Sequence, residues 1–166
     1  MLELLGSGLL RFGAWALPTV AQRFYDQEKL SSQIKIRVRG DGDGVVFNCG
    51  EMPYARVWLR ITNLSPIDVE FDRIFGEISC GSKLAAFHDL NRHLIKSAAE
   101  EEVFLDLMLT ADHSTFLRRN RQNHFQTTLS VSGYIYSSLH NYQLPYRELQ
   151  ARNVEFQNCN PLGATT

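Results

Sequence analysis

Alternating apolar and polar positions dominate the middle of the chain and predict strands with one buried and one exposed face. Residues 54–79 show this most clearly, because apolar side chains recur at every second position up to residue 61 and again from residue 67. We expect two strands here, joined at residues 63–66, and take this pair as the centre of the fold. The inward residues expected in the first strand are Val57, Leu59 and Ile61.

Similar alternation recurs before and after this central pair. The further segments predicted as strands are 33–39, 45–49, 83–89, 102–110, 124–136, 142–146 and 153–157. The Gly-Asp-Gly-Asp-Gly run at 40–44 predicts a hairpin turn, because glycine reaches positive φ and Asp-Gly pairs favour tight turns. A short helical segment is expected within 111–122, capped by Asp112 or Ser114. Residues 89–102 fit either a loop that leads into a strand or a helix.

Seven to nine short strands, with turn signals between them and no long helix in the body, predict a mainly β fold. We expect an immunoglobulin-like or fibronectin-III-like β-sandwich preceded by an N-terminal apolar helix. The expected organisation is a helix and linker at 1–32, a sandwich domain at 33–157 and a flexible tail at 158–166. Trp58 has two possible places, a core position like that of the immunoglobulin tryptophan or the charged outer face of its strand.

The first 21 residues are mostly apolar, and Glu3 and Arg11 are their only charges. Apolar residues at intervals of three and four predict a helix with one apolar stripe. The stretch approaches the roughly 20 residues that a membrane-spanning helix needs, but a charge near its centre disfavours insertion. It also lacks the positively charged region that opens a signal peptide.

Three interpretations remain open for this predicted apolar helix. It could pack on the body or on a partner chain, it could lie in a membrane interface, or it could act as a weak membrane anchor. The residues expected to contact the membrane or the partner are Leu9, Leu10, Phe12, Trp15 and Leu17.

Composition and charge narrow the class of partner. Of the 166 residues, 44% are hydrophobic and 21% are charged, which is typical of a globular domain with a packed core. The net charge is -1, and the one basic cluster, at 118–121, has no aromatic residue interleaved with it. We therefore expect no binding to nucleic acid.

The cysteines at 49, 80 and 159 are odd in number and far apart, and no pair has the C-x-x-C spacing of a zinc or redox motif. Three free thiols in a reducing compartment are expected, although one bridge such as Cys49–Cys80 stays open. The expected location is cytoplasmic or membrane-associated.

Candidate chemistry is sparse. The five histidines form neither an H-E-x-x-H nor an H-x-H pattern. The D-x-D-G run at 41–44 resembles the start of a calcium loop, but Met52 stands where that loop needs its glutamate. Asp112, His113 and Ser114 are sequence neighbours, which cannot usually adopt the relayed geometry of a catalytic triad. We therefore predict no catalytic residue, no cofactor and no metal site.

Several motifs follow one another in an order that resembles a known family. They are Ile61 to Pro66, the turn at Gly81, the aliphatic strand 103–109, the helical segment 114–121, Val131-Ser132-Gly133 and Leu144-Pro145-Tyr146. Together they resemble the late embryogenesis abundant type-2 domain, also called the water-stress and hypersensitive-response domain, over residues 33–157. The resemblance implies a fibronectin-III-like sandwich without enzymatic activity, which in several family members follows an N-terminal hydrophobic anchor.

The function expected from these observations is a non-enzymatic binding or assembly module. It is attached to a membrane surface or a partner protein through its N-terminal helix. The first alternative is a self-assembling structural protein that uses the helix to form homo-oligomers. The second is a hydrolase whose site is built from histidines in loops.

Overall fold

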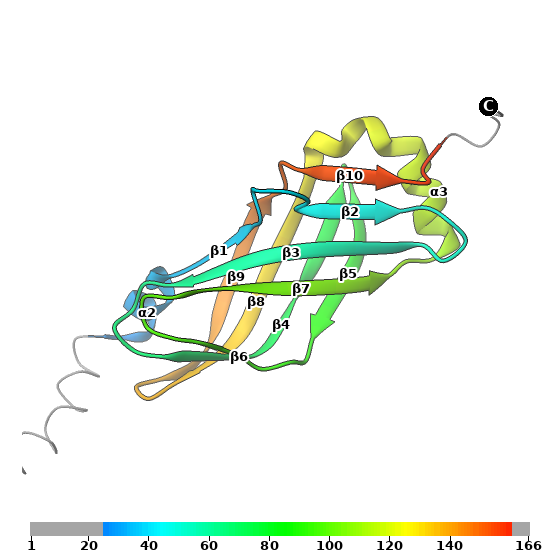
Figure 1. Cartoon of the computed structure of the whole chain (residues 1–166). Coiled ribbons are helices and arrows are strands. Elements are labelled where there is room, and N and C mark those ends of the chain that lie inside the picture. Colours follow the sequence, from blue (N-terminus) through cyan, green and yellow to red (C-terminus); the bar gives the residue numbers. More distant parts are fainter. Residues whose placement is uncertain (1–24, 161–166) are drawn as a thin grey trace, which may run out of the picture.

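The structure is a computed structural model that describes residues 25–160, and two facing β-sheets make up most of it (Figure 1). The predicted mainly β sandwich is therefore confirmed. The helices are α2 (Gln27–Gln33), α3 (Ala111–Asn120) and the 3-10 helix η1 (Arg121–Gln126). The strands are β1 (Ile34–Val38), β2 (Val45–Asn48), β3 (Tyr54–Asn63), β4 (Val69–Cys80), β5 (Lys83–Asp89), β6 (His93–Ile95), β7 (Glu100–Met108), β8 (Thr127–Ser137), β9 (Asn141–Gln150) and β10 (Val154–Gln157).

Each sheet is built around one long strand. In the first sheet, β7 pairs with one side of β3, while β1 and β2 pair with successive halves of its other side. β10 then adds to β2 in parallel. In the second sheet, β8 and β9 lie on one side of β4, and β5 and β6 pair with successive parts of the other side. We call these sheets A and B.

The strand count differs from the prediction, since residues 25–160 contain ten strands rather than seven to nine. The additional strand is β6, which has only three residues and lies in the segment predicted as a loop or a helix. Alternation cannot be recognised over so short a run, because the signal needs four to eight residues.

The connection between β3 and β4 differs from the predicted strand pair, because the two strands belong to different sheets. Asn63 is fully buried at the crossing, where its side-chain nitrogen donates to the carbonyls of Ile67, Ile95 and Lys96. Its side-chain oxygen accepts from the backbone N–H and the hydroxyl of Ser65. These bonds replace the ladder that a hairpin would form, so the chain can pass from sheet A to sheet B.

The predicted inward faces of β3, β7 and β8 are confirmed, whereas in β5 the face expected to hold Leu84, Ala86 and His88 was wrong, because Ala86 and His88 are exposed. The inner side of β3 is buried along its whole length, and β7 and β8 contribute matching apolar rows. Their buried apolar side chains are Val57, Leu59, Ile61, Val103, Leu105, Leu107, Leu129, Val131 and Ile135. Gly133 shows the bulge and the close backbone approach expected of it, because a Cβ there would lie 2.6 Å from the carbonyl oxygen of Arg73.

The extents of two strands and one turn also differ from the prediction. β8 begins at Thr127, because the preceding residues form η1. β9 is ten residues long and extends well beyond the predicted 142–146. The run at 40–44 is not a hairpin turn, because β1 and β2 both pair with β3 and not with each other. Asn153 holds this loop by donating to the carbonyls of Gly40 and Gly42.

The residues between the N-terminal segment and β1 form a helix and not a linker. Asp26 caps α2 by accepting from the backbone N–H of Lys29, and Leu30 is buried against the sandwich. The guanidinium of Arg147 on β9 donates to the carbonyl and the hydroxyl of Ser31. No helix within residues 25–160 has both the length and the apolar character needed to cross a membrane.

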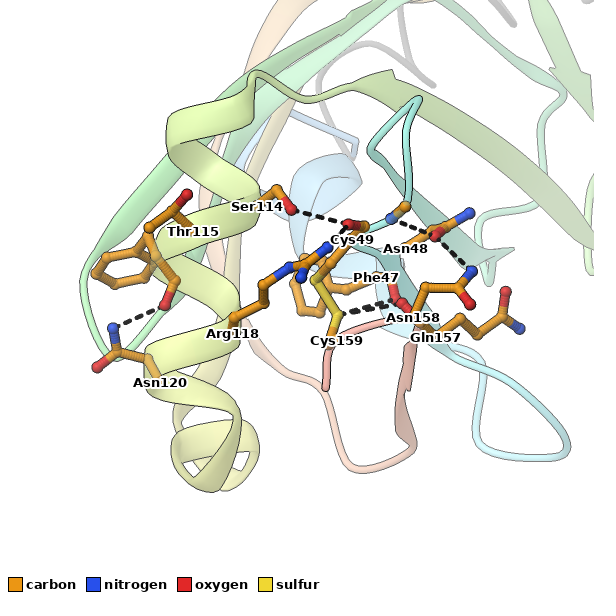
Figure 2. Close-up of a disulfide and its surroundings, with 12 residues drawn as sticks. Phe47, Asn48, Cys49, Ser114, Thr115, Arg118, Asn120, Gln157, Asn158 and Cys159 are labelled. Atoms are coloured by element: carbon orange, nitrogen blue, oxygen red, sulfur yellow. Dashed lines mark hydrogen bonds between the residues drawn. A yellow bond between two sulfur atoms is a disulfide. The ribbon is translucent and has the colours of Figure 1, made fainter. Parts of the chain in front are cut away.

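A disulfide joins Cys49 to Cys159 at the opposite end of the molecule, so the expectation of three free thiols was wrong (Figure 2). Parallel pairing of β2 with β10 aligns Asn48 with Gln157 and so brings the two cysteines together just beyond the strands. Cys80, the partner suggested for Cys49, is buried and lies outside the disulfide. Cys159 is itself buried, although the sequence placed it in a flexible tail.

Helix α3 covers this disulfide end (Figures 1 and 2). Ser114 and Arg118 both donate to the carbonyl oxygen of Cys49, and Leu117 is fully buried. The N-cap is Thr110, whose hydroxyl accepts from the backbone N–H of His113, so the predicted caps Asp112 and Ser114 were wrong. The N-cap therefore lies two to four residues before the predicted caps.

Thiol labelling under denaturing conditions tests the disulfide. Without reductant, we expect one labelled cysteine per chain, because Cys80 is the cysteine that lies outside the disulfide. After reduction, three labels are expected. Intact mass spectrometry gives both counts, and three labels without reductant would contradict the Cys49–Cys159 bond.

Candidate interaction surface

An aromatic cluster lies on the outer face of sheet B. It consists of Phe75 on β4, His88 on β5, Tyr134 on β8 and Tyr146 on β9, and we call it the aromatic patch. The ring centroid of Phe75 lies 6.3 Å from that of His88, 5.7 Å from that of Tyr134 and 6.0 Å from that of Tyr146. Phe75 is half-buried, and one ring from each of the other three strands lies close to it.

The aromatic patch is open to solvent. Tyr134 keeps 39% of its surface exposed and Tyr146 keeps 56%. The guanidinium of Arg73 lies 5.4 Å from the centre of the Tyr134 ring, at the edge of the patch. Tyrosine and arginine are enriched in the centres of protein interfaces, whereas an exposed sheet face is usually polar. The chemistry of this face therefore suits contact with a protein.

The outer face of sheet A has the opposite character, because its charges neutralise one another. Arg37 bonds Glu100 at 2.9 Å, and Arg60 bonds Asp41 at 2.7 Å. The hydrogen bond from Arg60 lowers the pKa of Asp41. A hydrogen bond from Thr62 is the main cause of the lowered pKa of Glu100, to which Arg37 and Arg60 add attraction.

Trp58 lies on this charged outer face and not at a core position, which were the two places considered for it. Its ring lies 5.2 Å from that of Phe104 on β7 and 4.8 Å from the guanidinium of Arg39. The tryptophan is half-buried between these side chains and is not part of the inner core. Trp58 is thus a packing residue of the outer face.

The histidines take different structural roles. His93 lies between the carboxylates of Asp89 and Glu101, with ring nitrogen to oxygen distances of 2.8 and 3.2 Å. This contact bridges the sheets, because Asp89 ends β5 in sheet B and Glu101 lies on β7 in sheet A. His113 completes the α3 capping box, and His88 belongs to the aromatic patch. Within residues 25–160, no group of three His, Cys, Asp or Glu side chains is arranged to hold a metal ion.

The residues predicted to contact a membrane or partner, Leu9, Leu10, Phe12, Trp15 and Leu17, lie outside the described residues. The sequence prediction did not identify the aromatic patch. A partial signal exists in β8, where Tyr134 and Tyr136 occupy the face opposite Ile135. Their meeting with Phe75 and Tyr146 depends on the order of strands in sheet B, which alternation does not reveal.

Comparisons with known proteins give structural likeness without a family. No protein-family model matches the chain, and no curated protein matches it. A structural-genomics target named SoR45 is 11% identical with a TM-score of 0.47, over 74% of this chain and 90% of its own. A protein from Archaeoglobus fulgidus is 12% identical with a TM-score of 0.37, over 72% and 95%. A protein provisionally assigned as late embryogenesis abundant is 9% identical with a TM-score of 0.39, over 91% and 90%.

Tyr142 lies on the inner side of β9, and the pKa of its phenol tests whether this side chain is buried. Burial raises the pKa of its phenol to about 12, and the hydroxyl has no hydrogen-bond partner among the described residues. Between about pH 10, the ordinary value, and pH 12, the folded chain keeps this proton while the unfolded chain releases it. Stability should therefore fall as pH rises through this window.

Urea unfolding of the wild type and of Tyr142→Phe at pH 8 and pH 11 measures this effect. We expect the variant to be at least as stable as the wild type at pH 8, because it removes an unpaired buried hydroxyl. It should lose less stability than the wild type at pH 11. Equal losses in the two proteins would show that Tyr142 ionises as readily in the folded chain as in the unfolded one.

Proposed function

We propose that this chain is a non-enzymatic binding module that holds a partner protein on the aromatic patch. The observation that carries the proposal is the meeting of Phe75, His88, Tyr134 and Tyr146 on an otherwise open sheet face. Large exposed apolar patches on soluble domains usually mark interaction surfaces. Aromatic rings also give large contact areas at a low cost in conformational entropy, which suits them to anchor a partner.

Residues 1–21 supply the second half of the proposal, as an attachment to a membrane surface. Their apolar stripe includes Leu9, Phe12 and Leu17, with Trp15 beside it. Aromatic and aliphatic residues on one face of a helix favour the boundary between lipid headgroups and acyl chains. A binding module held in this way would present the aromatic patch to partners near the membrane.

The disulfide supports a location in an oxidising compartment, because such bonds rarely persist in the cytosol. It closes a loop of 110 residues between Cys49 and Cys159. By loop-closure entropy alone, closing a loop of that size stabilises a domain by about 5 kcal/mol. We place the sandwich on the side of the membrane where thiols are oxidised, in contrast to the cytoplasmic option considered from the sequence.

The finer assignment of the fold is also part of this proposal. A fibronectin-III-like sandwich of the late embryogenesis abundant type-2 kind accords with the order of motifs between Ile61 and Tyr146. Self-assembly through the same patch or through residues 1–21 is the competing hypothesis, and the experiments below separate it from binding to another protein.

A photo-crosslinking residue at position 146 tests the aromatic patch in the full chain. We expect one defined adduct with another protein, absent when the same residue replaces Met52, which is 75% exposed on a turn. The purified partner should bind Tyr134→Lys at least tenfold more weakly than it binds the matched surface variant Leu64→Lys. An adduct with a second copy of this chain would favour self-assembly, and no adduct at position 146 would reject the patch.

Flotation with liposomes tests the attachment separately. The full chain should float with the vesicles, and the double variant Leu10→Glu and Leu17→Glu should remain at the bottom of the gradient. Both proteins should show the same circular dichroism spectrum of the sandwich. If neither protein floats and only the wild type forms oligomers, membrane attachment is rejected. Residues 1–21 would then act in contacts between protein chains.

A further inference from the structure

The open edge of β7 is the longest regular strand edge in residues 25–160. β7 has nine residues, and its pairing with β3 runs without a register shift. The other edges are interrupted or short. β5 and β9 carry register shifts in their ladders, β9 also contains Pro145, and β1, β6 and β10 have five residues or fewer. Such devices normally protect an edge strand against pairing with another chain.

The backbone groups on this edge are turned outward. Leu109 donates to the carbonyl of Pro53, and Asn63 donates to that of Ala99, so odd-numbered residues of β7 form the hydrogen-bonded pairs with β3. Even-numbered residues consequently present their N–H and C=O groups to the open side. In the described part of the chain these groups have no other backbone partner. The outward residues are Glu100, Glu102, Phe104, Asp106 and Met108.

A groove of about 380 Å³ runs along the same edge, between β7 and β5. Phe87, Leu105 and Leu107 give it an apolar floor, and Met108 is 77% exposed at its rim. The charged side chains among its described lining residues are Asp89 and Asp106, with no lysine or arginine. Arg56 approaches Asp106 to 3.6 Å from the outer face of sheet A.

We propose that β7 binds an extended segment of another protein by strand addition. The outward N–H and C=O groups supply the hydrogen bonds, as in other cases where a peptide extends a sheet. Every second side chain of the added strand is apolar and enters the groove. The intervening side chains are lysine or arginine, and one of them lies beside Asp106, whose contact with Arg56 is long at 3.6 Å, because opposite charges across neighbouring strands attract. Glu102 is already paired with Arg39 and Arg60 and is not needed for this contact.

The charges of β7 argue against a second copy of this chain as the occupant. Antiparallel pairing of two β7 strands about Phe104 would place Glu102 opposite Asp106 of the other copy. Like charges directly opposite one another destabilise such a pair. The proposed site lies on the edge of sheet A, whereas the aromatic patch lies on sheet B, and His88 is a residue that borders both.

Two ten-residue peptides test the proposal against the full chain labelled with ¹⁵N. One peptide alternates valine with lysine, and the other alternates valine with glutamate. The lysine peptide should shift the amide resonances of the five outward residues and slow their hydrogen exchange. The glutamate peptide should leave these resonances unchanged.

Met108→Pro and Met108→Ala form a matched pair, because both remove the side chain and only proline removes the outward N–H. We expect Met108→Pro to bind the lysine peptide at least tenfold more weakly than Met108→Ala does. Equal binding by the two variants, or no resonance shift in the wild type, would overturn strand addition at β7. The exchange measurement on the wild type decides the question if Met108→Pro does not fold.

Discussion

The crossing of the chain at Asn63 is the constraint on which the two-sheet arrangement depends. A buried amide that donates to three carbonyls and accepts from Ser65 joins the end of β3, the start of β4 and the end of β6. Without this amide, the crossing would lose five hydrogen bonds, and each buried polar group left without a partner would cost about 1–3 kcal/mol. The carbonyls of Ile67 and Lys96 also accept from Ser65 and Ala99, so the loss falls mainly on Ile95 and on the groups of Ser65. The same amide therefore both permits the passage between the sheets and fixes where it occurs.

Separation of the two central strands gives the molecule two outer faces with different chemistry. On sheet A, arginines and carboxylates alternate across neighbouring strands and neutralise one another, as the pair of Arg60 with Asp41 shows. On sheet B, aromatic rings meet around Phe75, and ion pairs such as that of Lys83 with Glu77 lie beside them. The charged side chains on the outer face of sheet A thus pair with one another, whereas the outer face of sheet B offers aromatic surface that a partner can cover.

Local alternation was sufficient to predict most strands and their inward faces, since the burial of one strand face follows a period of two residues. It did not predict which strands pair. The Cys49–Cys159 bond depends on parallel pairing between β2 and β10, which lie more than 100 residues apart. The aromatic patch likewise combines rings from four strands. The hydrogen bonds of Asn63 could not be predicted from the sequence for the same reason. Two of the carbonyls that accept from it belong to Ile95 and Lys96, which are distant in the sequence.

The importance of the Asn63 crossing is measured most directly by urea unfolding of Asn63→Leu. Leucine has a similar size but cannot pair the carbonyls and the N–H group that surround the amide. We expect a loss of about 3 kcal/mol or more. The neighbouring Thr62→Val, which changes only an exposed hydroxyl bond to Glu100, should lose less than about 1 kcal/mol. A variant Asn63→Leu as stable as the wild type would contradict the central role of this crossing.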